Sequence, residues 1–137
     1  MKRAIRAFVV LAAIVLTLPA VAQTLTGAQA QKSPQAEAFL AYEKALVGGG
    51  LEAARPHMTP EKVADLQSMV KMFGEEGFKQ FLDKMHGGAQ GEARRKQIEK
   101  VETKGDYAVL EARDSPNVVT VQHLLMTQDG WKVHVRR

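Results

Sequence analysis

Residues 104–135 read KGDYAVLEARDSPNVVTVQHLLMTQDGWKVHV, and this stretch decides the fold class. β-Branched and aromatic residues alternate with polar residues along it, which is the period of half-buried strands. Tight-turn residues interrupt the alternation at Gly105-Asp106, at 114–117 and at Asp129-Gly130. Short connections favour an antiparallel meander. Together with the basic segment before it, the stretch predicts four strands, over residues 93–103, 107–113, 118–127 and 131–136.

Helical patterns precede these strands. Ser33-Pro34 and Thr59-Pro60 each have the form of a helix N-cap followed by proline at the first helical position. Apolar residues then recur at helical spacing over 39–47 and 63–73, and a shorter amphipathic helix is predicted over 78–85. Helices first and strands afterwards predict an α+β fold, with the helices packed on one face of a curved, about four-stranded antiparallel sheet. The glycines expected to end or interrupt the helices are Gly48, Gly49, Gly50, Gly74, Gly77, Gly87 and Gly88.

The first 22 residues have the three parts of a secretory signal. Lys2, Arg3 and Arg6 precede an apolar run over 7–18, and Ala20-Val21-Ala22 is an A-x-A cleavage site. Twelve helical residues rise about 18 Å, which is too short for a hydrocarbon core of about 30 Å. We therefore predict a cleaved signal peptide over 1–22, a flexible spacer over 23–33 and one α+β domain over 34–137. The predicted location is the bacterial periplasm or the extracellular medium.

Cleavage changes the charge of the chain. The full sequence has a net charge of +4, and removal of Lys2, Arg3 and Arg6 leaves 4 − 3 = +1. A nearly neutral exported chain is not expected to bind nucleic acid. The chain has no cysteine, so neither a disulfide nor a lipid anchor on cysteine is available.

Strand register follows from the turns. A two-residue turn at Gly105-Asp106 pairs Val101 with Leu110 and Lys100 with Glu111. The longer loop at 114–117 leaves the register between the two hairpins open by one residue, and that slip would turn Tyr107, Val109 and Glu111 inward. A two-residue turn at Asp129-Gly130 pairs Gln128 with Trp131, Met126 with Val133 and Leu124 with Val135. That pairing predicts an apolar inner face of the last hairpin, opposite an outer face with His123 and His134.

The helix over 33–47, the hairpin KGDYAVL over 104–110 and the closing stretch over 124–135, with QDGWKV at 128–133, resemble the nuclear-transport-factor-2-like superfamily. The cystatin-like α+β fold of this superfamily is shared by steroid isomerases, polyketide cyclases and small exported proteins. The resemblance implies a pocket between the sheet and the helices, lined by apolar and aromatic side chains. The alternative is that these side chains only form the core. The candidate ligand-binding residues are Phe39, Tyr42, Leu66, Phe73, Phe78, Phe81, Met126 and Trp131.

The resemblance also implies a candidate for catalysis, because steroid isomerases of this superfamily use a tyrosine on the first helix as an oxyanion donor. Tyr42 lies on the first predicted helix, and Asp65, Asp83 or Glu111 would have to supply a base. No set of nucleophile, base and orienting group is evident in the sequence. A non-catalytic protein without a cofactor is therefore the favoured interpretation, and a cavity enzyme of isomerase or dehydratase type is the alternative.

Soft donors for copper were also considered, at Met69, Met72 and around His57-Met58 and Met85-His86. Methionines at helical spacing more simply fill gaps in a core, so we predict no metal. His123 and His134 come close across the last hairpin, but basic neighbours make a cation site there electrostatically unfavourable. The run Arg94-Arg95-Lys96 is interpreted as a charged edge strand, with an anion or lipid headgroup patch as the alternative.

Val119, Val121 and Leu125 place apolar side chains on the outer face of the predicted sheet, which predicts an interface. Dimerisation through the sheet is common in the superfamily that the chain resembles. The function predicted first is an exported binding or interaction domain, a homodimer with room for a small apolar ligand between helices and sheet. An inhibitor or immunity-type protein that binds another envelope protein is the remaining alternative.

Overall fold

The computed structural model describes residues 22–137, apart from the side-chain placement at residues 86 and 87. The predicted signal peptide therefore lies outside the described residues, except for Ala22. The helices and strands of the described part are β1 (Gln23–Thr26), α2 (Gly27–Gln31), α3 (Pro34–Ala54), α4 (Pro60–Lys84), α5 (Gly91–Gln97), β2 (Ile98–Lys104), β3 (Tyr107–Ser115), β4 (Val118–Thr127) and β5 (Gly130–His134). Short 3₁₀ turns follow α3 at Arg55–His57 and α4 at Met85–Gly88. Within residues 22–137, none of the helices combines the length and the apolar character needed to cross a membrane.

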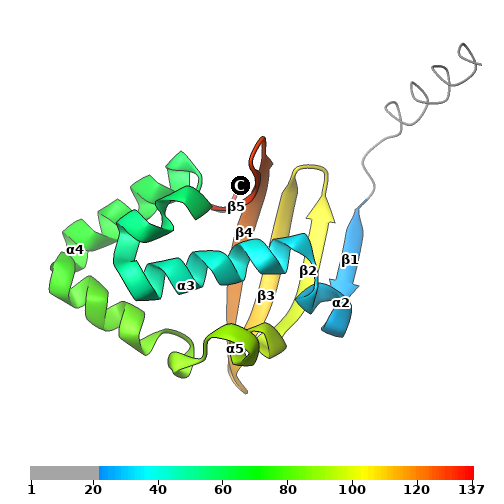
Figure 1. Ribbon diagram of the computed structural model, residues 1–137, viewed down its shortest axis with the longest axis horizontal. Coiled ribbons are helices and arrows are strands. Elements are labelled where there is room, and N and C mark those ends of the chain that lie inside the picture. The colour runs from blue at the N-terminus through cyan, green and yellow to red at the C-terminus, as the bar shows by residue number, and fades with distance from the viewer. Residues whose placement is uncertain (1–21) are drawn as a thin grey trace, which may run out of the picture.

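The sheet is antiparallel, open and ordered β1-β2-β3-β4-β5, so each strand pairs with its neighbour in sequence. Helix α3 crosses the strands on one face, and α4 lies mostly beyond the β5 side of the sheet (Figure 1). The α+β prediction is thus confirmed. Helix α3 turns one side toward the core, because its buried residues recur at helical spacing as Ala36, Phe39, Tyr42, Glu43 and Leu46.

The fifth strand comes from the segment that was predicted to be a spacer. Residues 23–26 pair with β2, Leu25 opposite Val101, and residues 27–31 form the short helix α2. The side-chain amide of Gln31 donates to the carbonyl of Ile98 at 3.3 Å, and Arg95 donates to the carbonyl of Gln31 at 2.8 Å. The prediction of a spacer here was wrong because these partners are distant in sequence and appear only when β2 is in place.

The predicted strand over 93–103 begins later than expected. Residues 91–97 form helix α5, and the strand starts at Ile98. Within α5, Arg94 is buried and bonded to residues of α3 and β3, so tertiary ion pairs set the position of this segment. The interpretation of Arg94-Arg95-Lys96 as an edge strand was therefore wrong.

The register of the first hairpin is confirmed, with Val101 opposite Leu110 and Lys100 opposite Glu111. The one-residue slip is excluded because Ala108, Leu110 and Ala112 are fully buried. The register predicted for the last hairpin was wrong.

In the last hairpin Met126 lies opposite Trp131, Leu124 opposite Val133 and Thr127 opposite Gly130. The hydroxyl of Thr127 donates to the carbonyl of Gly130 at 2.8 Å and accepts from the amide of Asp129 at 3.2 Å. These two bonds stabilise a turn whose two central residues are Gln128 and Asp129, whereas the sequence predicted Asp129 and Gly130. The register differs by two residues, so the same side chains still face inward.

Candidate ligand-binding cleft

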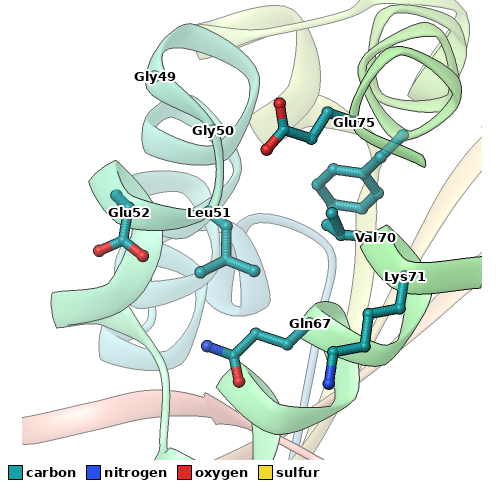
Figure 2. Close-up of a pocket in the computed structure, with 9 residues that line it drawn as sticks. Gly49, Gly50, Leu51, Glu52, Gln67, Val70, Lys71 and Glu75 are labelled. Atoms are coloured by element: carbon teal, nitrogen blue, oxygen red, sulfur yellow. The ribbon is translucent and has the colours of Figure 1, made fainter.

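A cleft of about 720 Å³ lies between the C-terminal part of α3 and the middle of α4. Its size is within the range of small-molecule sites, about 300–1,000 Å³. In Figure 2 Glu75 and Gln67 extend from α4 toward the segment of α3 that carries Gly50 and Leu51. The residues lining the cleft are Gly49, Gly50, Leu51, Glu52, Gln67, Val70, Lys71, Glu75 and Phe78.

Both walls of the cleft bend at a glycine. Gly50 interrupts α3 with φ 77° and ψ −166°, and Gly74 interrupts α4 with φ 75° and ψ 164°. This region of backbone space is open essentially to glycine alone. The predicted helix ends at these glycines are therefore bends, because the chain resumes helical geometry after each of them.

The floor of the cleft is apolar and its rim is charged. Leu51, Val70 and Phe78 supply the apolar surface, and Phe78 is almost fully buried. An adjoining hollow of about 400 Å³ shares Gly49, Gly50, Glu75 and Phe78 and extends to Leu46 and Leu82 of the core. The cleft therefore leads from a polar opening toward the hydrophobic core, which suits a ligand that is mostly apolar.

The structure distributes the eight predicted ligand-binding residues over several environments. Phe39, Tyr42 and Leu66 are buried in the core, and Trp131 packs partly buried against it. Phe73 and Met126 are exposed. Phe78 lines the cleft. Phe81 lines a different hollow of about 500 Å³, which α4 forms with β3 and β4.

Sequence reasoning missed most residues of the cleft, including Leu51, Gln67, Val70, Lys71 and Glu75. The glycines were the available signal, because two helices that each bend at a glycine can enclose space between their bends. The sequence does not show that the bends of α3 and α4 face each other.

Tyr42 lies in the core, only 3% exposed. Burial, followed by the nearby carboxylates of Glu43 and Asp65, raises the pKa of Tyr42 far above its ordinary value. The Tyr42 phenol therefore keeps its proton. Of the other carboxylates considered, Asp83 borders the hollow next to the cleft, and Glu111 lies on the outer sheet face, 3.4 Å from the Lys100 ammonium. The structure does not bring Glu111 together with Tyr42 in one pocket.

A buried ion-pair network joins α3, α5 and β3. Arg94 is 1% exposed, and its guanidinium donates to Glu43 at 2.8 and 3.1 Å and to Asp114 at 2.5 Å. It also donates to Gln97 at 2.8 Å and lies 5.3 Å from the centre of the Phe39 ring. The guanidinium of Arg94 thus bonds side chains of α3, α5 and β3, so the network holds these three elements together.

The outer face of the sheet exposes two of the three predicted interface residues. Val119 is 40% and Val121 49% exposed, and Leu125 is partly buried. These side chains point away from α3, because Leu124 between them is fully buried on the inner face. Val109 of β3 lies on the same outer face, opposite His123.

The methionines that are candidate copper donors lie in different environments. Met58 is buried, Met69 packs partly buried against the core, and Met72 is 74% exposed. Among residues 22–137, apart from the undescribed side chains at 86 and 87, no three histidine, aspartate or glutamate side chains gather as a metal site.

Comparison of the chain with protein-family models, with curated proteins and with solved structures found no match. The resemblance to the nuclear-transport-factor-2-like superfamily therefore stays a prediction.

Proposed function

We propose that this protein is a non-catalytic binding domain that holds a small apolar ligand in the cleft between α3 and α4. The observation that carries the proposal is the cleft of about 720 Å³, with an apolar floor and glycine bends in both walls. Apolar surface that stays open to water costs about 25 cal/mol per Å², so a ligand that covers it gains free energy. The ligand is thus proposed to lie between two helices, whereas the sequence predicted a pocket between the helices and the sheet.

The rim of the cleft limits the charge of the ligand. Glu52 and Glu75 are acidic, Lys71 is basic, and Gln67 is neutral. Because Glu52 is paired with Arg55 at 2.7 Å and the charges of Glu75 and Lys71 are opposite, the rim gives no strong preference for a charged ligand of either sign. We therefore propose a neutral ligand, whose polar end faces Gln67 and whose apolar part contacts Leu51, Val70 and Phe78.

The proposal is tested with the neutral fluorescent probe N-phenyl-1-naphthylamine, whose emission rises in an apolar environment. Substitution Gln67→Trp fills the cleft from an exposed position, so it removes space without removing core packing. Gln80→Trp places the same side chain at an exposed position of α4 outside the cleft and is the matched control. We expect Gln67→Trp to weaken probe binding at least tenfold and Gln80→Trp to leave it unchanged.

Equal binding by the wild type and both variants would overturn the proposal, and so would the absence of saturable probe binding to the wild type. A native mass spectrum of the chain beginning at Gln23 adds an independent readout. Retained small-molecule mass that is lost in Gln67→Trp supports the cleft. Export of the protein is part of the proposal and rests on residues 1–22.

A second proposal concerns self-association through the outer sheet face. Val119 and Val121 are exposed on the face opposite α3, and Val109 and Leu125 are their neighbours on it. Charges of both signs border these residues, with Lys100 next to Glu111 and Arg113 bonded to Glu99. A second copy in the reverse orientation would bring opposite charges together. We therefore propose a homodimer, and a monomer would favour binding of another envelope protein.

A further inference from the structure

His123 of β4 and His134 of β5 form a cross-strand pair, directly opposite each other. Both lie on the outer face of the sheet, since Leu124 and Val133 beside them are fully buried on the inner face. Neither histidine lines the cleft between α3 and α4. The histidine pair is therefore separate from the proposed ligand-binding cleft.

Each imidazole is held by a hydroxyl group at Nδ1. The Tyr107 hydroxyl is 2.5 Å from Nδ1 of His123, and the Thr59 hydroxyl is 2.7 Å from Nδ1 of His134. The Tyr107 oxygen also accepts from the backbone N–H of Arg137, and the Thr59 oxygen accepts from the backbone N–H of Lys62. Tyr107 and Thr59 are thereby fixed on the Nδ1 side of the two rings.

These bonds are compatible with one tautomer in both rings. A hydroxyl that already accepts one hydrogen bond still has its own proton, which it can donate to Nδ1 of the imidazole beside it. An imidazole that accepts at Nδ1 is neutral and carries its proton on Nε2. Burial, followed by the charges of Arg136, Lys62 and His134, lowers the pKa of His123, which favours the same neutral form.

The two rings differ in exposure, since His123 is partly exposed whereas His134 is only 7% exposed. Within residues 22–137 no protein group accepts a hydrogen bond from Nε2 of His123 or His134. Neither atom is among the described polar atoms that are sealed from solvent without a partner. Two N–H donors therefore stand side by side on neighbouring strands.

Two cations, Lys62 and Arg136, are close enough to affect the His123 ring. The side chain of Lys62 is only 15% exposed, and the carboxylate nearest its ammonium, Asp65, is 3.7 Å away. Burial lowers the pKa of Lys62, because a buried ammonium is less well solvated. Arg136 follows β5, on the same side of the strand as His134 by alternation.

Other charged groups near the histidine pair form ion pairs of their own or lie at Nδ1 of His134. Lys132 is 3.6 Å from Asp129, and Arg137 is 3.4 Å from Asp106. The carboxylate of Glu61 is 3.8 Å from Nδ1 of His134, the side of the ring away from Nε2. The charges of Arg136 and Lys62 that act on the His123 ring are positive.

We propose that Nε2–H of His123 and His134, together with Lys62 and Arg136, form a binding site for a small oxyanion, a phosphate or carboxylate group. Two adjacent N–H donors match two oxygens of such a group, and charge-assisted bonds from the two cations strengthen its binding. A metal ion is disfavoured at the same atoms, because Nε2 carries a proton and both flanking side chains are cations. The site uses no residue of the cleft.

The first test reads the tautomers directly by long-range ¹H–¹⁵N NMR of the histidine rings at pH 7.5. We expect the pattern of a neutral ring with the proton on Nε2 at His123 and His134. Inorganic phosphate, added at constant ionic strength, should then shift both Nε2 signals saturably. His57, which lies outside the pair, is the internal control and should not shift.

Substitution Lys62→Met should weaken phosphate binding at least tenfold, whereas Lys79→Met, at an exposed position of the same helix outside the cleft, should leave it unchanged. Arg136→Met, at an exposed position, gives the same test if Lys62→Met fails to fold. A titration with acetate distinguishes a phosphate ligand from a carboxylate ligand. A site that accepts carboxylates binds both acetate and phosphate, whereas a site selective for phosphate binds phosphate alone. Protons on Nδ1 of both rings, or equal and unsaturable shifts at His57, would overturn the proposal.

Discussion

Arg94 of α5 donates two hydrogen bonds to the carboxylate of Glu43 on α3, and both side chains are almost fully buried. Asp114 of β3 accepts a third bond from the same guanidinium and also accepts from the Thr120 hydroxyl of β4. One arginine thus connects two helices with the middle of the sheet. The position of α5, which sequence patterns assigned to a strand, depends on these bonds.

Removal of Arg94 should strongly destabilise the fold. Arg94→Met removes the buried guanidinium that bonds Glu43 and Asp114, and breaking a buried ion pair costs about 3–5 kcal/mol. Arg95→Met is the matched control, because the pairs of Arg95 with Glu37 and Glu92 are on the surface and such pairs contribute at most about 1 kcal/mol. Urea unfolding followed by circular dichroism measures both. Equal losses for the two variants would contradict a structural role of the network.

Substitution of Gly74 by alanine should destabilise α4 and alter the cleft. The backbone of Gly74 lies in a region that costs other residues about 1–3 kcal/mol, so the helix must pay this strain or straighten. Gly48→Ala is the control, since a Cβ there meets no atom within 4 Å and φ is not positive. Alanine in place of a helical glycine is stabilising by about 0.5–1 kcal/mol. A higher midpoint temperature of thermal unfolding for Gly74→Ala than for the wild type would refute the bend at Gly74.

Self-association should depend on the outer sheet face. Val121→Lys places a charge at the centre of the exposed valines, so the proposed dimer should dissociate. Met72→Lys makes a similar change at a more exposed position on α4, away from the sheet, and should have no effect. Light scattering after size-exclusion chromatography gives the mass of each. A dimer that persists in Val121→Lys would remove this face from consideration.

The free energy of unfolding should fall in mild acid, in part through His123. Its pKa is lowered from 6.5 by burial and then by Arg136, Lys62 and His134, so the folded state favours the neutral ring. The contribution of His123 is therefore fully present above about pH 6.5 and is lost as the pH falls through the lowered pKa. Denaturant unfolding between pH 8 and pH 5 should show a smaller decrease for His123→Gln than for the wild type. His57→Gln is the comparison, and identical pH profiles for the two variants would exclude a role of His123.

The order of elements could be read from the sequence. Ser33-Pro34 and Thr59-Pro60 start α3 and α4 as predicted, and in both helices the cap hydroxyl accepts a backbone N–H. The hairpin register around Gly105-Asp106 was also predictable, since a two-residue turn and an alternating pattern agree there. The last hairpin was not, because a hydroxyl of Thr127 shifted its turn.

The cleft and the histidine pair could be predicted only in part. Phe78 was recognised as apolar, and His123 and His134 were expected on one outer face. The sequence did not predict that the bends at Gly50 and Gly74 lie opposite each other. It also did not predict the contact of Thr59 with His134, which are 75 residues apart. Contacts of this kind depend on how α4 docks against β5.

The sequence by itself determined the helix starts, the alternation of the strands and hence the α+β class, because caps, turns and periodicity act over a few neighbouring residues. Only the tertiary structure decided that residues 23–26 form a fifth strand, that Arg94 is buried, and that two bent helices leave a cleft between them. These features rest on partners distant in the chain. Their free energy exists only once the sheet and helices are packed together.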